Sequence, residues 1–256
     1  MVIGVFDSGV GGLSVLRHIP PLVPEADILY LADQARAPYG TRGLDEVEGI
    51  AIEVSQSLIA AGASTVVVAC NTASAAALDT LRVEFPTIPF VGMEPAVKPA
   101  VGSTASGVIG ILATGATFQS ERYASVVRRF AGGAEIRVAA CPDWVAIVES
   151  GDIDGREVEE AVRSRLTPIL EAGADTLVLG CTHFPFLLDV ISRVAGPSIR
   201  LVDPGSAVAR QVARVHQGSG SGSLTLATTG DTEIFARQAA RLVPELAASP
   251  VLAFSV

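Results

Sequence analysis

The sequence predicts an α/β fold of two pseudo-symmetric lobes, each a mostly parallel β-sheet flanked by helices, with a functional site in the crevice between them. Three observations predict this fold. Short β-branched runs alternate with segments of helical spacing. Ten residues near position 61 recur near position 172. The chain has 256 residues, 49% hydrophobic and 18% charged, which rules out disorder and allows two packed cores.

Nine short runs rich in β-branched residues predict the strands. They lie at Val2–Phe6, Ile28–Leu31, Thr65–Ala69, Pro89–Val91, Val108–Leu112, Ile136–Ala139, Thr176–Gly180, Ile199–Val202 and Leu224–Ala227. Helical spacing fills many of the intervals, and the stretch 44–62 is an example, with Val47, Ala51, Val54 and Leu58 on one face. Nearly continuous apolar strands separated by helices are typical of parallel sheets covered on both faces.

Two short segments mark the later part of the chain. Asp203-Pro204 predicts a helix start, with Asp as the N-cap and Pro at the first helical position. The alternating glycines and serines of Gly218–Ser223 predict a flexible connector.

An internal repeat predicts the two lobes. Ala61–Cys70 matches Ala172–Cys181 at an offset of 111, with six of ten positions identical. Val2–Ser8 similarly matches Val108–Thr114 at an offset of 106. The offsets are nearly equal, so we interpret the echoes as one duplicated α/β unit, too long for a solenoid repeat. We expect residues 1–95 plus 207–256 to form one lobe and residues 96–206 the other.

Composition excludes several classes of protein. A net charge of −9 argues against nucleic-acid binding, which needs clustered cations. No apolar run approaches the roughly 18 residues of a membrane-spanning helix. The N-terminal residues form a predicted strand and lack a basic leader, so we expect a cytoplasmic protein. Three widely spaced cysteines, Cys70, Cys141 and Cys181, do not suggest a disulfide framework.

The repeat places two of these cysteines in equivalent positions. Cys70 and Cys181 each end an apolar strand, and a Thr-containing turn then leads toward a helix. Each could be a small buried hydrophobic residue. Ligands of open α/β sheets bind at the carboxyl ends of strands, however, so the two thiols are expected to face one crevice.

Other chemistries fit these residues less well. The turn Asp7–Gly12 fails the dinucleotide pattern because Ser14 stands where Gly or Ala is needed, although its backbone suits a small anion. Asp7 itself could be only an N-cap. A hydrolase built on Cys181 and His183 leaves Cys70 without a role. A metal site is disfavoured by the wide spacing of cysteine and histidine.

Two equivalent thiols are suited to inverting a stereocentre, because a proton must leave one face of a carbon and another must arrive on the opposite face. Many racemases instead use pyridoxal phosphate anchored on a lysine. The only lysine is Lys98, between Val97 and Pro99 with no supporting motif. The residues therefore favour a mechanism without cofactor or metal.

The sequence resembles the glutamate racemases of the cofactor-independent aspartate/glutamate racemase group, from Ile3 to about Glu233. The motifs that carry the resemblance are Phe6–Val15, Pro38–Gly40, Ala69–Ser74, Gly92–Pro99, Leu179–Pro185 and Val202–Gly205. Two segments depart from the family pattern, Leu31–Ala37 and the stretch around Trp144 and Ala146. Both departures concern the wall of the pocket rather than the thiols.

The resemblance implies a role for each site residue. Cys70 would act on D-glutamate with support from Asp7, and Cys181 on L-glutamate with support from His183 and Glu149. The implied substrate contacts are Asp7, Ser8, Pro38, Tyr39, Gly40, Asn71, Thr72, Thr117, Thr182 and His183. Without the resemblance, Glu149 would be interpreted as a solvated helix end.

The resemblance also implies the biological context: a homodimer that uses no metal or cofactor and supplies D-glutamate for peptidoglycan, and so for cell-wall biogenesis and cell shape. Two alternatives stay open at this point. One is a racemase for aspartate or another small acid, because few pocket residues select chain length. The other is a non-catalytic protein that binds a small acid or a partner, although such a protein would not need both thiols.

Overall fold

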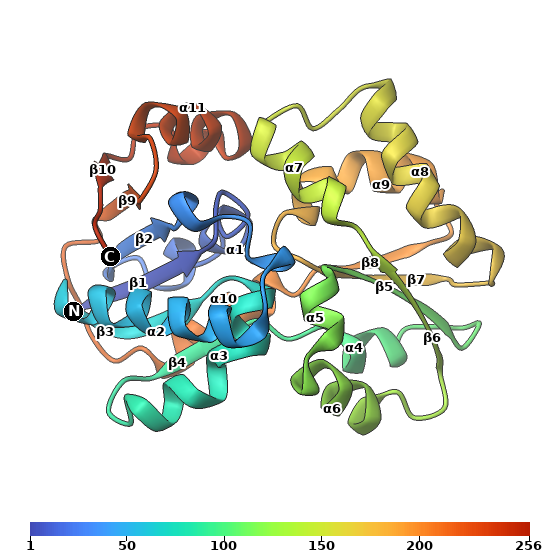
Figure 1. Ribbon diagram of the computed structural model, residues 1–256, viewed down its shortest axis with the longest axis horizontal. Coiled ribbons are helices and arrows are strands. Elements are labelled where there is room, and N and C mark those ends of the chain that lie inside the picture. Colours follow the sequence, from blue (N-terminus) through green and yellow to red (C-terminus); the bar gives the residue numbers. More distant parts are fainter.

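The computed structural model describes all 256 residues and contains two β-sheets in which every paired strand is parallel (Figure 1). The first sheet has six strands in the order β10-β9-β2-β1-β3-β4. Their bounds are β1 Val2–Asp7, β2 Asp27–Ala32, β3 Ala63–Val68, β4 Phe90–Gly92, β9 Leu224–Thr228 and β10 Val251–Ala253. The second sheet has four strands in the order β6-β5-β7-β8. Their bounds are β5 Val108–Ala113, β6 Glu135–Ala140, β7 Thr176–Gly180 and β8 Arg200–Val202.

All nine predicted strands are present, shifted at their ends by at most two residues. β10 was not predicted. It is a three-residue edge strand that pairs only with β9, and Leu252 at its centre is half exposed. Its sequence therefore carries no long apolar signal.

Eleven α-helices connect the strands. They are α1 Leu13–Leu16, α2 Leu44–Ala60, α3 Asn71–Glu84, α4 Val97–Val101, α5 Gly115–Gln119, α6 Glu121–Phe130, α7 Pro142–Ser150, α8 Arg156–Glu171, α9 Leu188–Ala195, α10 Gly205–Val215 and α11 Thr232–Leu242. Five short 3-10 segments also occur, at Pro20–Leu22 (η1), Gln34–Arg36 (η2), Tyr39–Thr41 (η3), Phe184–Leu187 (η4) and Pro244–Leu246 (η5). No helix is both long and apolar enough to span a membrane.

The first sheet is covered on both faces, as its alternating side chains require. Ile3 and Val5 of β1 belong to the hydrophobic cluster that includes residues of α1, α10 and α11. Phe6 belongs to a second cluster, formed with α2 and α3. In α2 the predicted face is the buried one, and its four residues are fully inaccessible to solvent: Val47, Ala51, Val54 and Leu58.

We call the part of the chain that builds the six-stranded sheet, together with α1–α3, α10 and α11, the first lobe. The second lobe comprises α4 to β8. The boundaries predicted at 95/96 and 206/207 stay predictions, and the second of them falls inside α10. One large hydrophobic cluster runs through both lobes, joining Leu13 of the first to Phe184 and Trp144 of the second. The Trp144 and Phe184 rings pack edge to face, 4.9 Å apart.

The predicted start of α10 is wrong by one residue: the helix begins at Gly205, and its N-cap is Pro204 rather than Asp203. Asp203 lies just before the helix, where its Oδ1 accepts a hydrogen bond of 2.8 Å from the N–H of Gly205, two residues later, as Asp side chains do in turns.

The connector Gly218–Ser223 has no regular secondary structure, but it is held in place rather than loose. Asp27 Oδ1 accepts hydrogen bonds from the backbone N–H and the hydroxyl of both Ser221 and Ser223, at 2.7–3.1 Å. These bonds hold the pKa of Asp27 well below its ordinary value. The glycine-serine composition predicts flexibility. It could not reveal the restraint, because Asp27 lies nearly 200 residues away in the sequence.

Candidate active site

A cavity of about 310 Å³ lies between the two lobes, beyond the carboxyl ends of β1, β3, β5 and β7. This volume suits a small ligand, and the position is the one expected of ligand sites in open α/β sheets. The residues that line it are Asp7, Ser8, Gln34, Ala37, Pro38, Tyr39, Gly40, Thr41, Cys70, Asn71, Thr72, Thr114, Pro142, Val145, Ala146, Glu149, Cys181, Thr182 and His183.

Both thiols predicted from the repeat face this cavity. Cys70 follows β3 and Cys181 follows β7, and both are nearly buried and free of disulfides. Cys141, the third cysteine, is fully buried and does not line the cavity. Burial and the charge of Asp143 raise its pKa to about 12, so it is an inert core residue.

Cys70 is the N-cap of α3. Its Sγ accepts from the N–H of Ala73 at 3.5 Å, and the positive end of the helix dipole favours a thiolate there. Burial and the negative charge of Asp7 act in the opposite direction and raise the pKa of Cys70 well above its ordinary value. Burial and Asp7 therefore favour the thiol form of Cys70.

Asp7, the last residue of β1, is completely buried beside Cys70. One carboxylate oxygen accepts from the backbone N–H and the hydroxyl of Ser8, at 2.5 and 3.1 Å. The other accepts from the hydroxyl of Thr182 in the second lobe, at 2.9 Å. Burial raises the pKa of Asp7 despite the opposing charge of His183, so this carboxyl group can hold a proton near neutral pH more readily than an exposed one.

Cys181 has a different partner. Its Sγ lies 3.7 Å from Nδ1 of His183, whose Nε2 lies 2.7 Å from Oε1 of Glu149. Burial alone would lower the pKa of His183, but its contacts with Cys181 and Glu149 outweigh burial and raise it well above the ordinary value. Burial would raise the pKa of Glu149, but the hydrogen bond and charge of His183 lower it. The result is an ion pair poised beside the thiol.

The glycine turn of the first lobe makes room for this pair. A Cβ at Gly9 would lie 2.8 Å from Cδ of Glu149, and one at Gly11 would lie 2.5 Å from Cε1 of His183. The N–H of Val10, between these glycines, donates to Glu149 Oε1 at 2.9 Å. The predicted anion site in this turn is thus filled by a carboxylate of the protein itself.

Asn71 is the clearest ligand-binding side chain. It is buried at the start of α3, and neither its amide oxygen nor its amide nitrogen has a hydrogen-bond partner in the protein. Buried polar atoms are rarely left unpaired, so a ligand is expected to satisfy them.

A chain of three hydroxyls lines the neighbouring wall. Thr72 Oγ1 lies 3.0 Å from Thr114 Oγ1, which in turn lies 3.0 Å from Thr117 Oγ1. Thr114 faces the cavity, whereas Thr117 is placed behind it. Sequence reasoning missed Thr114. The repeat held the signal, since Thr114 occupies the position in the second copy that is equivalent to Ser8 in the first.

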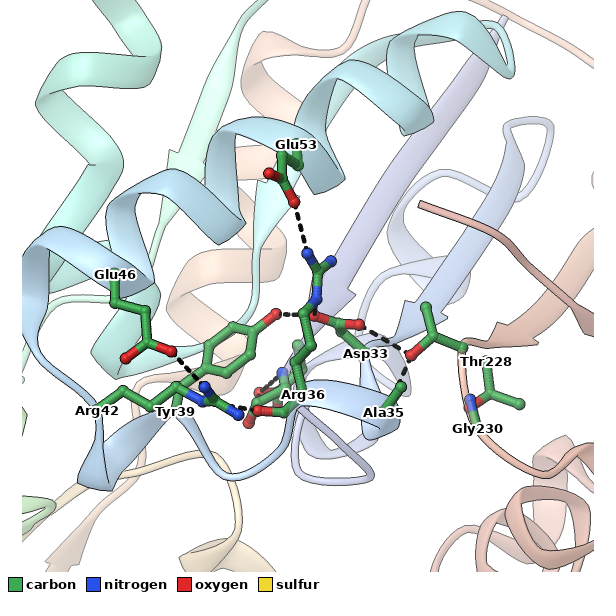
Figure 2. Close-up of polar contacts among 12 residues, drawn as sticks. Asp33, Ala35, Arg36, Tyr39, Arg42, Glu46, Glu53, Thr228 and Gly230 are labelled. Carbon is green, nitrogen blue, oxygen red and sulfur yellow. Dashed lines mark hydrogen bonds and ion pairs between the residues drawn. The ribbon is translucent and has the colours of Figure 1, made fainter.

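The loop Pro38–Gly40 also lines the cavity, with Gly40 close to Thr114, and Asp33 supports this loop (Figure 2). Asp33 is completely buried and accepts from the hydroxyl of Tyr39, from Nε of Arg36 at 2.7 Å and from the hydroxyl of Thr229 at 2.8 Å. Arg36 also pairs with Glu53 of α2 at 2.7 Å. This network spans the segment that departs from the family pattern, so the unusual residues serve to support the wall.

The remaining lining residues were not predicted individually as substrate contacts, although most of them lie in the two segments assigned above to the pocket wall: Gln34, Ala37, Thr41, Pro142, Val145 and Ala146. Pro142, Val145 and Ala146 belong to α7, the second segment that departs from the family pattern. Trp144 of that helix points away from the cavity into the core, against Phe184. No group of three or more His, Cys, Asp or Glu side chains is arranged to hold a metal ion.

The sequence of this chain is similar to those of known racemases. The family model described as Asp/Glu/Hydantoin racemase matches residues 9–212. A glutamate racemase from Roseiflexus sp. (strain RS-1) is 50% identical over 248 residues, covering 94% of this chain and 91% of its own.

Two solved structures resemble the whole fold. A glutamate racemase isoform from Bacillus anthracis aligns with a TM-score of 0.88 at 32% identity, over 100% of this chain and 97% of its own. The Escherichia coli glutamate racemase, in complex with L-glutamate and an activator, aligns with a TM-score of 0.86 at 32% identity, over 98% and 97% of the two chains.

Proposed function

Because the chain belongs to the Asp/Glu/Hydantoin racemase family, we propose that the two thiols of its interlobe cavity interconvert L- and D-glutamate by direct proton transfer. The single observation that carries this mechanism is that Cys70 and Cys181, from equivalent positions of the two lobes, line one small cavity. The chain is a racemase, and its relatives are named glutamate racemases, so glutamate rather than aspartate is the substrate.

In the direction from L to D, the thiolate of Cys181 removes the α-proton. The Cα–H bond breaks, an S–H bond forms, and the electron pair moves onto the substrate carboxylate as an enediolate. The thiol of Cys70 then gives its proton to the opposite face of Cα, so its S–H bond breaks and a new Cα–H bond forms. Cys70 ends as a thiolate and Cys181 as a thiol, and the reverse reaction begins from that state.

The neighbouring residues move the thiol protons. Asp7, whose pKa is raised by burial, returns a proton to Cys70. Before the next turnover from L to D, Cys181 loses the proton it gained, which passes to solvent by way of His183, held by Glu149. The positive charge of His183 stabilises the thiolate that remains. We assign substrate contacts to the cavity-lining residues Ser8, Pro38, Tyr39, Gly40, Asn71, Thr72 and Thr182. Thr117 acts through Thr114.

The cellular context follows from the same chemistry. The product D-glutamate supplies peptidoglycan synthesis. Both thiols must stay reduced to work, which favours the reducing cytoplasm as the location. We also propose a homodimer, supported by the resemblance to the family, and light scattering on a size-exclusion column tests it by giving the mass of the particle.

Circular dichroism of L- and D-glutamate incubated with the purified protein tests the function. We expect the signal of either isomer to decay to zero with neither metal nor pyridoxal phosphate added, and aspartate to keep its signal. Dependence on either additive, or activity that survives blocking of both thiols, would overturn the mechanism. Racemisation of aspartate at a higher rate than glutamate would show that glutamate is not the preferred substrate.

The division of labour between the thiols is tested with β-chloroglutamate, which loses HCl after α-deprotonation and needs no reprotonation. Replacing either thiol removes one proton relay and stops racemisation. We expect Cys70→Ser to eliminate HCl from the L isomer alone, through Cys181, and Cys181→Ser from the D isomer alone, through Cys70. Asp7→Asn should impair elimination from the D isomer more than His183→Asn does. If both cysteine variants eliminate from the same isomer, the two-face mechanism is wrong.

A further inference from the structure

We propose that Gln238 of α11 is a positioning residue for the Cys181 half of the reaction: it holds the backbone of Glu149 from across the lobe boundary and so fixes the carboxylate on which His183 depends. This inference rests on the proposed function and extends it to a helix that takes no part in lining the cavity. Figure 1 shows α11 of the first lobe beside α7 of the second.

The contact itself is short and specific. Gln238 Nε2 donates to the backbone oxygen of Glu149 at 2.6 Å. Glu149 lies in the last turn of α7, where backbone carbonyls lack partners within the helix. The Gln238 amide therefore caps the helix end that carries the Glu149 carboxylate.

The orientation of the Gln238 amide is fixed by a directed chain of hydrogen bonds. Gly230 N–H donates to Thr228 Oγ1 at 3.0 Å, and the Thr228 hydroxyl donates to Gln34 Oε1 at 2.9 Å. Gln34 Nε2 then donates to Gln238 Oε1 at 2.8 Å. This series of hydrogen bonds begins at the N–H of Gly230, which can only donate, and ends at the backbone oxygen of Glu149, which can only accept. The side-chain amides of Gln34 and Gln238 therefore cannot flip without losing hydrogen bonds.

Glu149 is thereby held by the first lobe at two points. Its side-chain Oε1 accepts from Val10 N–H, and its backbone oxygen accepts from Gln238. The same Oε1 receives Nε2 of His183, which contacts Cys181. Loss of the backbone contact would let the end of α7 shift, lengthen the bond between Glu149 and His183, and weaken the proton relay of Cys181. Cys70 and Asp7 lie in the first lobe, and their hydrogen bonds are to Ala73, Ser8 and Thr182, none of which belongs to α7.

This asymmetry gives a readout that a general loss of stability would not produce. We expect Gln238→Leu, which keeps side-chain size and helix propensity, to slow HCl elimination from L-β-chloroglutamate about tenfold, less than the ~100-fold that a 1 Å misplacement can cost. Elimination from the D isomer should stay close to the wild-type rate.

Arg241→Gln is the matched control. Arg241 lies one turn later in α11 and also crosses to the second lobe, where it pairs with Asp152 at 2.7 Å. Both side chains are mostly exposed, and neither forms a hydrogen bond or ion pair with Glu149. We expect Arg241→Gln to leave both elimination rates unchanged. Equal losses for both enantiomers in Gln238→Leu, or the same selective loss in Arg241→Gln, would overturn the assignment.

A second measurement does not depend on catalysis. The chain has three histidines, so the NMR signal of His183 can be identified by its absence in His183→Asn. We expect the pKa of His183 to fall in Gln238→Leu and to stay unchanged in Arg241→Gln. An unchanged value in Gln238→Leu would overturn the inference. A wild-type protein that eliminates HCl from neither enantiomer would instead contradict the proposed function, and the titration would still decide the role of Gln238.

Discussion

At the scale of single residues, the tightest steric constraints in the site fall on two glycines. Gly9 and Gly11 have no side chain, and the second lobe uses the resulting space for Glu149 and His183. A methyl group at Gly11 would also lie 2.6 Å from Oγ1 of Thr182, so His183 and Thr182 would both have to move. The turn therefore sets how closely the two lobes approach.

Gly11→Ala should for that reason abolish most activity without unfolding the protein. We expect kcat/KM for glutamate to fall by about 100-fold, the cost of misplacing catalytic groups by roughly 1 Å. Gly49→Ala is the control, because a Cβ there meets no atom within 4 Å. Gly49 lies inside α2, so that change should keep activity and raise the free energy of unfolding by about 0.5–1 kcal/mol. Wild-type kinetics in Gly11→Ala would refute the tight approach.

The pair of His183 and Glu149 should make stability depend on pH in a defined direction. The folded-state pKa of His183 is raised, so its contribution is complete below its ordinary pKa of 6.5 and is lost as pH rises through the folded value. The pKa of Glu149 is lowered, so its contribution is present above its ordinary value of 4.5 and is lost only as pH falls through the lowered one. Glu149→Gln should therefore cost more stability at pH 6 than at pH 9.

Urea unfolding at the two pH values measures this difference. We expect a loss of about 1.5–3 kcal/mol at pH 6, the range for a hydrogen bond to a charged group, and a smaller loss at pH 9. Glu159→Gln, which removes an exposed ion pair within α8, should show little change at either pH. Equal losses for Glu149→Gln at both values would mean that His183 is not charged in the folded protein.

Sequence reasoning found the residues of the site whose signal is local or repeated. The two thiols, Asp7 and His183 stood at strand ends that the repeat marked as equivalent. Glu149 was found only through the resemblance, because a Glu near a helix end is ordinary. Gln34 and Gln238 could not be found, since their importance lies in a contact between positions 204 residues apart.

At the scale of elements, the strands were predictable because buried parallel strands are continuously apolar. The contacts that hold the connecting segments in place could not be predicted in this way. The connector Gly218–Ser223 has the composition of a flexible linker, but Asp27 holds it. The placement of α11 is the same kind of case, because its amphipathic pattern predicts a buried face without saying that the helix end reaches the other lobe.

Asp27→Ala should release the connector. We expect faster cleavage within Gly218–Ser223 by subtilisin, because four hydrogen bonds to one oxygen are lost. Glu25→Ala is the control, since the connector uses only the backbone of Glu25, as acceptor of the Gly220 N–H. Gel analysis of a time course gives both rates. Equal rates in Asp27→Ala and wild type would show that the carboxylate does not restrain the segment.

At the scale of the whole molecule, the site is complete only when the lobes are together. Outside the cavity, Arg122 of α6 in the second lobe pairs with Asp79 of α3 at 2.8 Å and also with Glu94, in the segment that joins the lobes. Arg122 is largely buried, whereas Asp79 is mostly exposed. These pairs favour the closed arrangement without touching the reacting groups.

Arg122→Gln should raise KM for glutamate while leaving kcat nearly unchanged, because a smaller fraction of molecules is closed before binding. The expected change is at most about 5-fold, matching the ~1 kcal/mol upper range of such pairs, and it should shrink in 1 M salt. Arg128→Gln breaks an ion pair within α6 and should change neither constant. A loss confined to kcat would contradict a role in closure.

The order of strands in the first sheet has a consequence for how the protein is made. The four-stranded sheet comes from one unbroken stretch, whereas the six-stranded sheet takes β9 and β10 from the end of the chain. On the ribosome, the second lobe can finish while β2 still shows an open apolar edge, which is where a chaperone would be needed. The helix that carries Gln238 is made after the segments that carry the two thiols. A nascent chain therefore holds both thiols before it holds the contact that supports Cys181.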